Sequence, residues 1–302
     1  MHRDEIHIRD PFVFVEDDRY YLLGTTGDDP WGLASDFTLY ESSDLETFDP
    51  VCIMVENSSL AGYTNRWAPE LHRYEGKYYL IVSLFRADKG RGSMILVSSS
   101  LREPFVPLTG EYITPEGWGC LDATLFIHEG KPYLCFSNEW TTPITHDGDG
   151  ALFIAELSHD LRQLVTPPVK IISGKYNGLS KQVCNSEARG FVAEGPWLYE
   201  DGNRIVLLWS TFTETGYTVI QSHSEGGVYG DYVFDRVVFS KDGGHCMRFL
   251  DLQGKPWITM HQPNQTPLER MRLFPADCAL KQDFSLFSLF LDFMMKSTEG
   301  IA

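Results

Sequence analysis

Residues 10–26 read DPFVFVEDDRYYLLGTT, and the same phrase recurs four more times along the chain. Each copy starts with one residue ahead of an apolar strand, followed by a turn such as Glu75-Gly76 and a second apolar strand. The later copies are APELHRYEGKYYLIVS (68–83), DATLFIHEGKPYLCFSNEW (122–140), EGPWLYEDGNRIVLLWS (194–210) and HCMRFLDLQGKPWITMHQPN (245–264). Regular repetition of one β unit is typical of radial or stacked β architectures.

The intervals between the copies predict four strands in each repeat. Two strands belong to the phrase itself, and residues 93–100, 151–157 and 218–224 have the alternation or apolar density of a third strand. Room remains for an outer strand after each of them. We therefore predict an all-β fold, a five-bladed β-propeller with four-stranded antiparallel blades around a central axial cavity.

The domain organisation follows from the same spacing. We expect one catalytic propeller over residues 1–280 and a C-terminal strand or tail over residues 281–302 that packs on it without forming a separate domain. The apolar run at residues 284–295 is too short to span a bilayer and contains Asp292, so it is not predicted to cross a membrane.

Composition narrows the classes of partner and the compartment. The formal net charge of −17 argues against nucleic acid and against an anionic membrane surface. The cysteines show neither a CxxC pair nor the density of a disulfide-rich secreted domain. The N-terminal residues MHRDEIHIRDPF contain no apolar leader, so we expect a cytoplasmic protein, or a secreted one if a signal peptide has been removed.

The first position of the phrase is polar in four of its five copies. It is occupied by Asp10, Ala68, Asp122, Glu194 and His245. Equivalent positions in a propeller are related by rotation, so we expect the polar side chains to converge on one central cavity. Each acid by itself has an ordinary alternative, a capped turn or a pair with an arginine. Three converging carboxylates have pKa values pushed apart, which supplies the acid and the base that glycosidic cleavage requires.

The motifs around these positions resemble glycoside hydrolase family 43. The resemblance rests on IRDPF with Asp10, WAPELH at 67–72, LDATLF with Asp122, EGPWLY with Glu194, and GGHCMRF with His245. It implies a five-bladed propeller that acts mainly on arabinofuranosides and xylosides by inversion. It also implies that Asp10 is the general base, Glu194 the general acid, and Asp122 the residue that orients the acid and holds up its pKa.

The resemblance also implies candidate metal and sugar contacts. A histidine at the place of His245 often ligates a calcium ion on the propeller axis in that family. The alternative is a histidine that is hydrogen-bonded to Asp122 or to a water molecule. Trp67 is the leading candidate for a sugar-stacking wall, with Phe85 and Trp118 as weaker substrate-binding candidates, although each tryptophan could equally be buried between blades.

The resemblance therefore implies an inverting, exo-acting glycosidase for α-L-arabinofuranosidic or β-D-xylosidic bonds of plant-derived oligosaccharides. No organic cofactor is expected, and the oligomeric state is not predicted. Two alternatives stay open from the sequence. One is a retaining propeller glycosidase with Asp10 as nucleophile, and the other is a non-catalytic carbohydrate-binding propeller.

Overall fold

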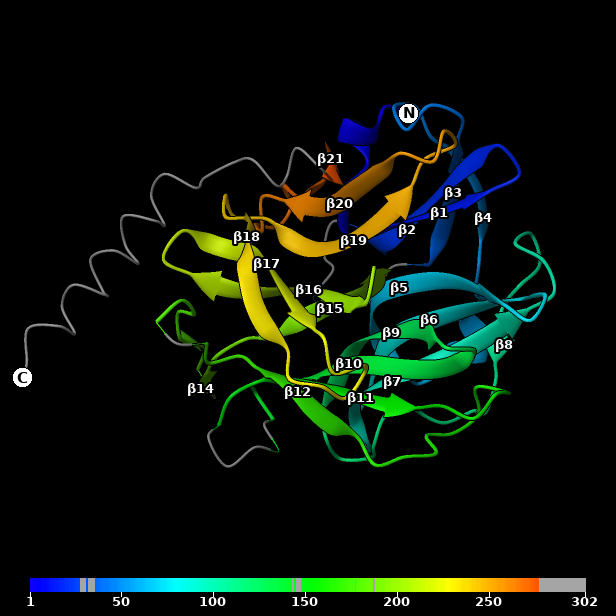
Figure 1. Cartoon of the computed structure of the whole chain (residues 1–302). Helices are drawn as coiled ribbons and strands as arrows, with labels where there is room; N and C mark the ends of the chain where they lie inside the picture. Colours follow the sequence, from blue (N-terminus) through cyan, green and yellow to red (C-terminus); the bar gives the residue numbers. More distant parts are fainter. Residues whose placement is uncertain are drawn as a thin grey trace, which may run out of the picture.

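The protein is a ring of five antiparallel β-sheets (Figure 1), seen in a computed structural model. The structure describes residues 1–27, 31, 36–142, 144, 148–176, 178–186 and 188–276. Within that part the only helices are the short 3-10 turns η1 (Arg3–Glu5) and η2 (Asn57–Leu60). No helix in these ranges has the length and hydropathy needed to cross a membrane. The predicted five-bladed β-propeller is confirmed.

Each sheet is one blade, with its first strand at the axis. Blade 1 comprises β1 (Ile8–Glu16), β2 (Arg19–Thr26), β3 (Thr38–Ser42) and β4 (Asp49–Ile53). Blade 2 comprises β5 (Thr64–Tyr74), β6 (Lys77–Arg86), β7 (Gly90–Ser98) and β8 (Val106–Pro107). Blade 3 comprises β9 (Cys120–His128), β10 (Lys131–Asn138), β11 (Ala151–Glu156) and β12 (Val169–Ser173). Blade 4 comprises β15 (Glu194–Asp201), β16 (Arg204–Thr213), β17 (Gly216–Ser224) and β18 (Val233–Phe239). Blade 5 comprises β19 (Gly244–Leu250), β20 (Pro256–Gln262) and β21 (Arg270–Pro275).

The predicted third strands are present as β7, β11 and β17. Blade 5 has three strands among the described residues, whereas the other blades have four. The long interval between blades 3 and 4 holds a two-stranded hairpin, β13 (Val183–Cys184) with β14 (Arg189–Gly190). The predicted C-terminal segment 281–302, with its apolar run at 284–295, lies outside the described residues.

The core lies between the blades, where the apolar faces of neighbouring sheets meet. Large side chains such as Phe48, Phe105 and Trp209 are fully buried there. Burial of each such side chain stabilises the fold by about 1.5–3 kcal/mol relative to exposure. Because the blades cover one another's faces, the strand ends at the axis can carry polar residues without weakening the core.

A β-bulge interrupts the first strand of every blade at the axis. At each bulge one residue adopts a left-handed backbone with φ between 44° and 57°; these residues are Asp10, Ala68, Asp122, Gly195 and His245. The prediction that Glu194 shares this position is therefore wrong by one residue. The polar residue of the fourth copy precedes its bulge, and Gly195 takes the left-handed conformation that glycine adopts without strain.

Hydrogen bonds between neighbouring blades hold the bulges in a ring. At four junctions the bulge N–H donates to a side chain on the second strand of the preceding blade. These bonds join Ala68 to Thr25 Oγ1 (2.8 Å), Asp122 to Ser83 Oγ (2.8 Å), His245 to Ser210 Oγ (2.9 Å) and Asp10 to His261 Nδ1 (3.2 Å). The bond to His261 closes the ring between the last blade and the first.

The junction between blades 3 and 4 uses different partners. Gly195 N donates to Asp122 Oδ2 at 3.1 Å, and Ser137 Oγ donates to Ala193 O at 2.5 Å. The bulge amide of blade 4 thus binds a carboxylate of blade 3 in place of a hydroxyl. This exception ties Asp122 directly to the residue that follows Glu194.

Candidate active site

Asp10 is an ionised carboxylate at the axis. Thr25 Oγ1 donates to its Oδ2 at 2.8 Å, and His245 Nδ1 lies 3.2 Å from its Oδ1. Burial alone would raise the pKa of Asp10. The charges of His245 and Arg9 and the hydrogen bond from Thr25 together hold that pKa below its usual value. A carboxylate that stays ionised in a closed site is suited to accept a proton.

Asp122 has the opposite tendency. Its side chain is 5% exposed, and it accepts the Gly195 N–H at 3.1 Å. Burial raises the pKa of Asp122 to about 8, and the charges of Glu194 and Asp10 raise it as well, against the attraction of His245. Asp122 therefore binds a proton far more readily than an exposed aspartate.

Glu194 lies beside Tyr217, whose hydroxyl donates to Glu194 Oε1 at 2.7 Å. Burial raises the pKa of Glu194, as does the charge of Asp10, whereas the Tyr217 hydrogen bond and His245 lower it. Since Asp122 and Glu194 both have raised pKa values and repel each other when ionised, the pair holds at least one proton near neutral pH. Tyr217 engages Oε1, so a proton on Glu194 resides on Oε2.

The glycine pair before His245 makes room for this arrangement. A Cβ atom on Gly244 would lie 2.4 Å from Tyr217 Cε1, and one on Gly243 would lie 2.8 Å from His261 O. The two glycines therefore permit a close backbone approach that no larger residue would allow. Its consequence is that the Tyr217 ring fits beside the axis with its hydroxyl directed at Glu194.

His245 lies between the carboxylates. Its Nδ1 is 3.2 Å from Asp10 Oδ1 and 3.6 Å from Asp122 Oδ2. Burial would lower the pKa of His245, but Asp10, Asp122 and Glu194 raise it above its usual value. A protonated imidazole at this place reduces the repulsion among the three acids. The separation of 3.6 Å from Asp122 is too long for the hydrogen bond considered from the sequence.

The described side chains around His245 do not by themselves form a calcium shell. In proteins, a calcium ion binds roughly six to eight oxygen ligands. The cavity beside His245 measures about 10 Å³ and is lined by Asp10, Glu70 and Met247 among others. Such a volume holds about one water molecule. Within the described ranges, no three His, Cys, Asp or Glu side chains form a group that could hold a metal ion.

Of the three aromatic residues predicted to bind substrate, two lie close together and the third packs against another blade. Trp67 directly precedes the bulge of blade 2, the register position that Glu194 occupies in blade 4. Phe85 pairs with Arg91 across β6 and β7, close to Trp67. Trp118, which precedes β9, instead packs edge-on against Phe153 at 5.2 Å between ring centroids. It is only partly buried by this contact, and its role in substrate binding stays a prediction.

Several residues of the site are not apparent from the sequence. Tyr217 lies in the third strand of blade 4, and His261 lies near the end of the fifth copy of the phrase; their rings stack at 5.6 Å with an interplanar angle of 20°. Burial and the charge of Arg9 together lower the pKa of His261 to about 3, so this imidazole is neutral. Its Nδ1 can then accept the Asp10 N–H. Only contact between blades could have revealed these residues.

Comparison with known proteins agrees with this geometry. Residues 5–274 match the family Glycosyl hydrolases family 43. A solved endo-arabinase from Bacteroides thetaiotaomicron is 33% identical with a TM-score of 0.83, over 91% of this chain and 96% of that one. Extracellular exo-α-(1→5)-L-arabinofuranosidases of Streptomyces chartreusis and Streptomyces avermitilis are 29% and 27% identical, over 53% and 69% of this chain. The chain spans 47% and 42% of those two relatives, somewhat less than half their length.

These relatives correct one prediction. Both Streptomyces enzymes are extracellular, which contradicts the expected cytoplasmic location. That expectation relied on the polar character of residues 1–12 and on cysteines without a disulfide pattern. Five cysteines in the described part are indeed free, but free thiols do not determine where a protein works. With the family matched over nearly the whole propeller and the acidic site in place, the chain belongs to glycosyl hydrolase family 43 and is a glycosidase.

Proposed function

We propose that the protein hydrolyses α-L-arabinofuranosidic bonds of plant-derived oligosaccharides by single-displacement inversion. Two kinds of relative support this substrate: a solved endo-arabinase at 33% identity and curated arabinofuranosidases. β-D-Xylosidic bonds are the second candidate. Their support is weaker, since the solved endo-1,4-β-xylanase is 22% identical and indicates the fold alone.

The observation that carries the mechanism is the opposite direction of two pKa shifts in one site. The pKa of Asp10 is lowered and that of Glu194 is raised. In the proposed reaction Asp10 takes a proton from a water molecule while the oxygen of that water attacks the anomeric carbon. Glu194 gives its proton to the departing glycosidic oxygen as the C–O bond breaks. The products are a free sugar of inverted configuration and an alcohol.

Asp122 and His245 are assigned supporting roles. Asp122 accepts the N–H of Gly195, the residue after Glu194, so its charge and position act directly on the acid. Asp122 and Glu194 also compete for protons, so ionisation of one raises the pKa of the other. His245 stays close to Asp10 and balances the negative charge there.

The reaction class is tested on nitrophenyl arabinofuranosides, xylosides and galactosides, followed by NMR of the first-formed sugar. The proposal predicts turnover of the α-L-arabinofuranoside and an initial anomer opposite to that of the substrate. An initially retained anomer would establish the alternative in which Asp10 is the nucleophile. Absence of turnover on every glycoside, with intact sugar affinity, would establish a binding module.

A calcium ion at His245 stays a prediction, and no step of the reaction depends on it. His245 would supply one nitrogen ligand, and water would have to supply most of the others. Metal analysis of the dialysed protein tests it. About one equivalent of calcium per chain would support the ion, and its removal by EDTA should then lower the melting temperature.

A further inference from the structure

Two arginines and two tryptophans form a continuous row at one side of the site, called here the mouth row. The Arg9 guanidinium lies 4.6 Å from the Trp31 ring centroid. Trp31 meets Trp67 edge to face, with centroids 5.5 Å apart and an interplanar angle of 79°. The Arg91 guanidinium lies 3.7 Å from the Trp67 ring centroid. A cation–π interaction therefore stabilises the position of each indole ring.

Acidic side chains fix both arginines. Arg9 Nη1 donates to Glu269 Oε1 at 2.5 Å, and Arg91 Nε lies 3.3 Å from Glu139 Oε2. The arginine side chains are only 10% and 11% exposed, so each ion pair is largely screened from water. Arg9 is thus held by a hydrogen-bonded ion pair, whereas Arg91 is held by burial and by the charge of Glu139. Both guanidinium groups lie against the tryptophan rings in these positions.

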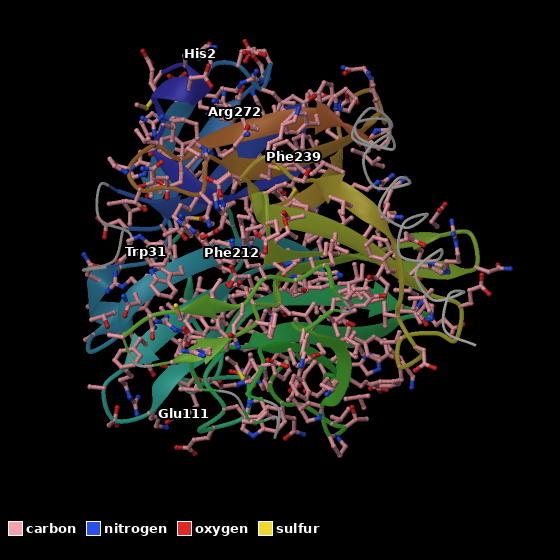
Figure 2. The ribbon with its side chains drawn as sticks, turned by 90° about the vertical axis from the view of Figure 1, so that its left-hand side faces the viewer. His2, Trp31, Glu111, Phe212, Phe239 and Arg272 are labelled. Carbon is pink, nitrogen blue, oxygen red and sulfur yellow. The ribbon has the colours of Figure 1, made fainter. Side chains whose placement is uncertain are left out.

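Trp31 bridges three parts of the propeller. Its Nε1 donates to Thr266 Oγ1 at 2.9 Å, and its carbonyl accepts from Asn65 Nδ2 at 2.7 Å. Figure 2 shows Trp31 between the blue first blade and the cyan second blade. Despite these bonds, 53% of the residue is exposed. Arg9 covers one face of the indole and leaves large apolar surface open to a ligand.

The mouth row adjoins the catalytic residues. Arg9 directly precedes Asp10 in the chain, and Trp67 holds in blade 2 the register position of Glu194 in blade 4. The charges of Arg91 and Asp122 also act on each other. An exposed indole beside an acidic sugar-cleaving site is suited to stacking against the C–H face of a sugar.

We propose that the mouth row binds the sugar unit that precedes the cleaved residue, so that the site holds at least two units on the glycone side. The assignment rests on the proposed function, because that function gives the site its direction. Glu194 on blade 4 protonates the leaving oxygen, so the leaving group extends from the blade 4 side. The mouth row comes from blades 1 and 2, beside Asp10, and therefore contacts the other part of the substrate.

A second glycone-side subsite changes the expected product. An enzyme with one glycone unit releases single sugars from chain ends, as the sequence led us to expect. With the mouth row occupied, the first product contains two or more units, and bonds inside a chain become accessible. The substrate class is a linear oligosaccharide of at least three pentose units.

The test is Trp31→Ala, compared on linear α-1,5-arabinotetraose and on nitrophenyl α-L-arabinofuranoside, which has a single glycone unit. We expect kcat/KM for the tetraose to fall about tenfold more than kcat/KM for the aryl glycoside. Trp31→Phe should recover part of the difference. Trp257→Ala is the matched control, since Trp257 also has a cation over its ring (Lys255, 5.2 Å) and a side-chain acceptor (Asp251, 2.8 Å), but lies in blade 5. The control should leave the ratio of the two rates unchanged.

Equal losses on both substrates, or wild-type release of single arabinose units as the first product, would overturn the proposal. Measurements of oligosaccharide affinity distinguish failure of the mouth-row proposal from failure of the proposed function. Binding of arabino- and xylotetraose is measured by calorimetry in the Glu194→Gln background, with and without Trp31→Ala. Weaker binding of the xylo-oligosaccharide alone would keep the mouth row and reject arabinose as the substrate. Unchanged affinity for both would reject the mouth row itself.

Discussion

Blades 1 and 4 present carboxylates from the same backbone motif, but the two acids have opposite pKa shifts. Asp10 stands on the bulge itself, beside His245, with Thr25 donating to it. Glu194 stands one residue ahead of its bulge and accepts from the neutral hydroxyl of Tyr217. The positive neighbours of Asp10 lower its pKa by more than burial raises it. At Glu194 the effect of burial is larger, and the pKa is raised.

A displacement of one residue therefore separates the proposed base from the proposed acid. Asp10, at the bulge, meets His245, whereas Glu194, at the preceding position, meets Tyr217. A propeller can supply chemically different groups in this way without altering the repeat. The predictions below test whether that difference governs activity and stability.

The largest effect is expected from removal of either acid. Asp10→Asn and Glu194→Gln should each lower kcat on an oligosaccharide by about 10²–10⁴-fold, the usual contribution of general acid–base catalysis. On an aryl glycoside with a good leaving group, Glu194→Gln should lose much less, because that group needs little protonation. Asp10→Asn should lose equally on both substrates. If Asp10→Asn, and not Glu194→Gln, kept more activity on the aryl glycoside than on the oligosaccharide, the two roles would be reversed.

A smaller effect is expected from Tyr217→Phe. Loss of the hydroxyl removes a hydrogen bond that lowers the pKa of Glu194, so that pKa should rise. The alkaline limb of the pH–rate profile should move to higher pH, with kcat reduced about tenfold. Tyr232→Phe is the matched control, because Tyr232 is also buried and its hydroxyl donates to Val228 O at 3.3 Å. A shift of the same size in the control would contradict the role of Tyr217.

Asp122 should affect stability in a pH-dependent way. Its folded pKa of about 8 is above the value of an exposed aspartate, so the folded state binds this proton more tightly than the unfolded state does. The resulting stability is full below about pH 4 and is lost as the pH rises through about 8. The melting temperature of Asp122→Asn should therefore increase relative to wild type between pH 5 and pH 8.5. A constant difference would show that the aspartate pKa is not raised.

The smallest effect concerns the ring of bonds between blades. Ser83→Ala removes the acceptor of the Asp122 N–H and should lower the free energy of unfolding by about 1 kcal/mol. Ser93 faces Ser83 in the paired strand, is also buried, and its hydroxyl has no hydrogen-bond partner. Ser93→Ala should therefore be neutral or stabilising in urea unfolding. Equal losses in the two variants would show that the inter-blade bond contributes nothing specific.

The sequence predicted the fold well because each blade repeats one strand–turn–strand unit with its own turn. It also identified Asp10, Asp122, Glu194 and His245, since polar residues at the start of buried strands are conspicuous. The register of Glu194 was wrong because a bulge leaves no signal in residue type. Tyr217, Arg91 and Trp31 escaped notice because their roles depend on contacts between segments far apart in the chain.

The pH dependence of kcat/KM in wild type and in Glu194→Gln tests the central claim most directly. With Asp10 as base and Glu194 as acid, the wild-type profile should be bell-shaped, falling at low pH as Asp10 is protonated and at high pH as Glu194 is ionised. Glu194→Gln should keep the acidic limb and lose the alkaline limb. An alkaline limb that persists unchanged in Glu194→Gln would contradict the assignment of Glu194 as the acid.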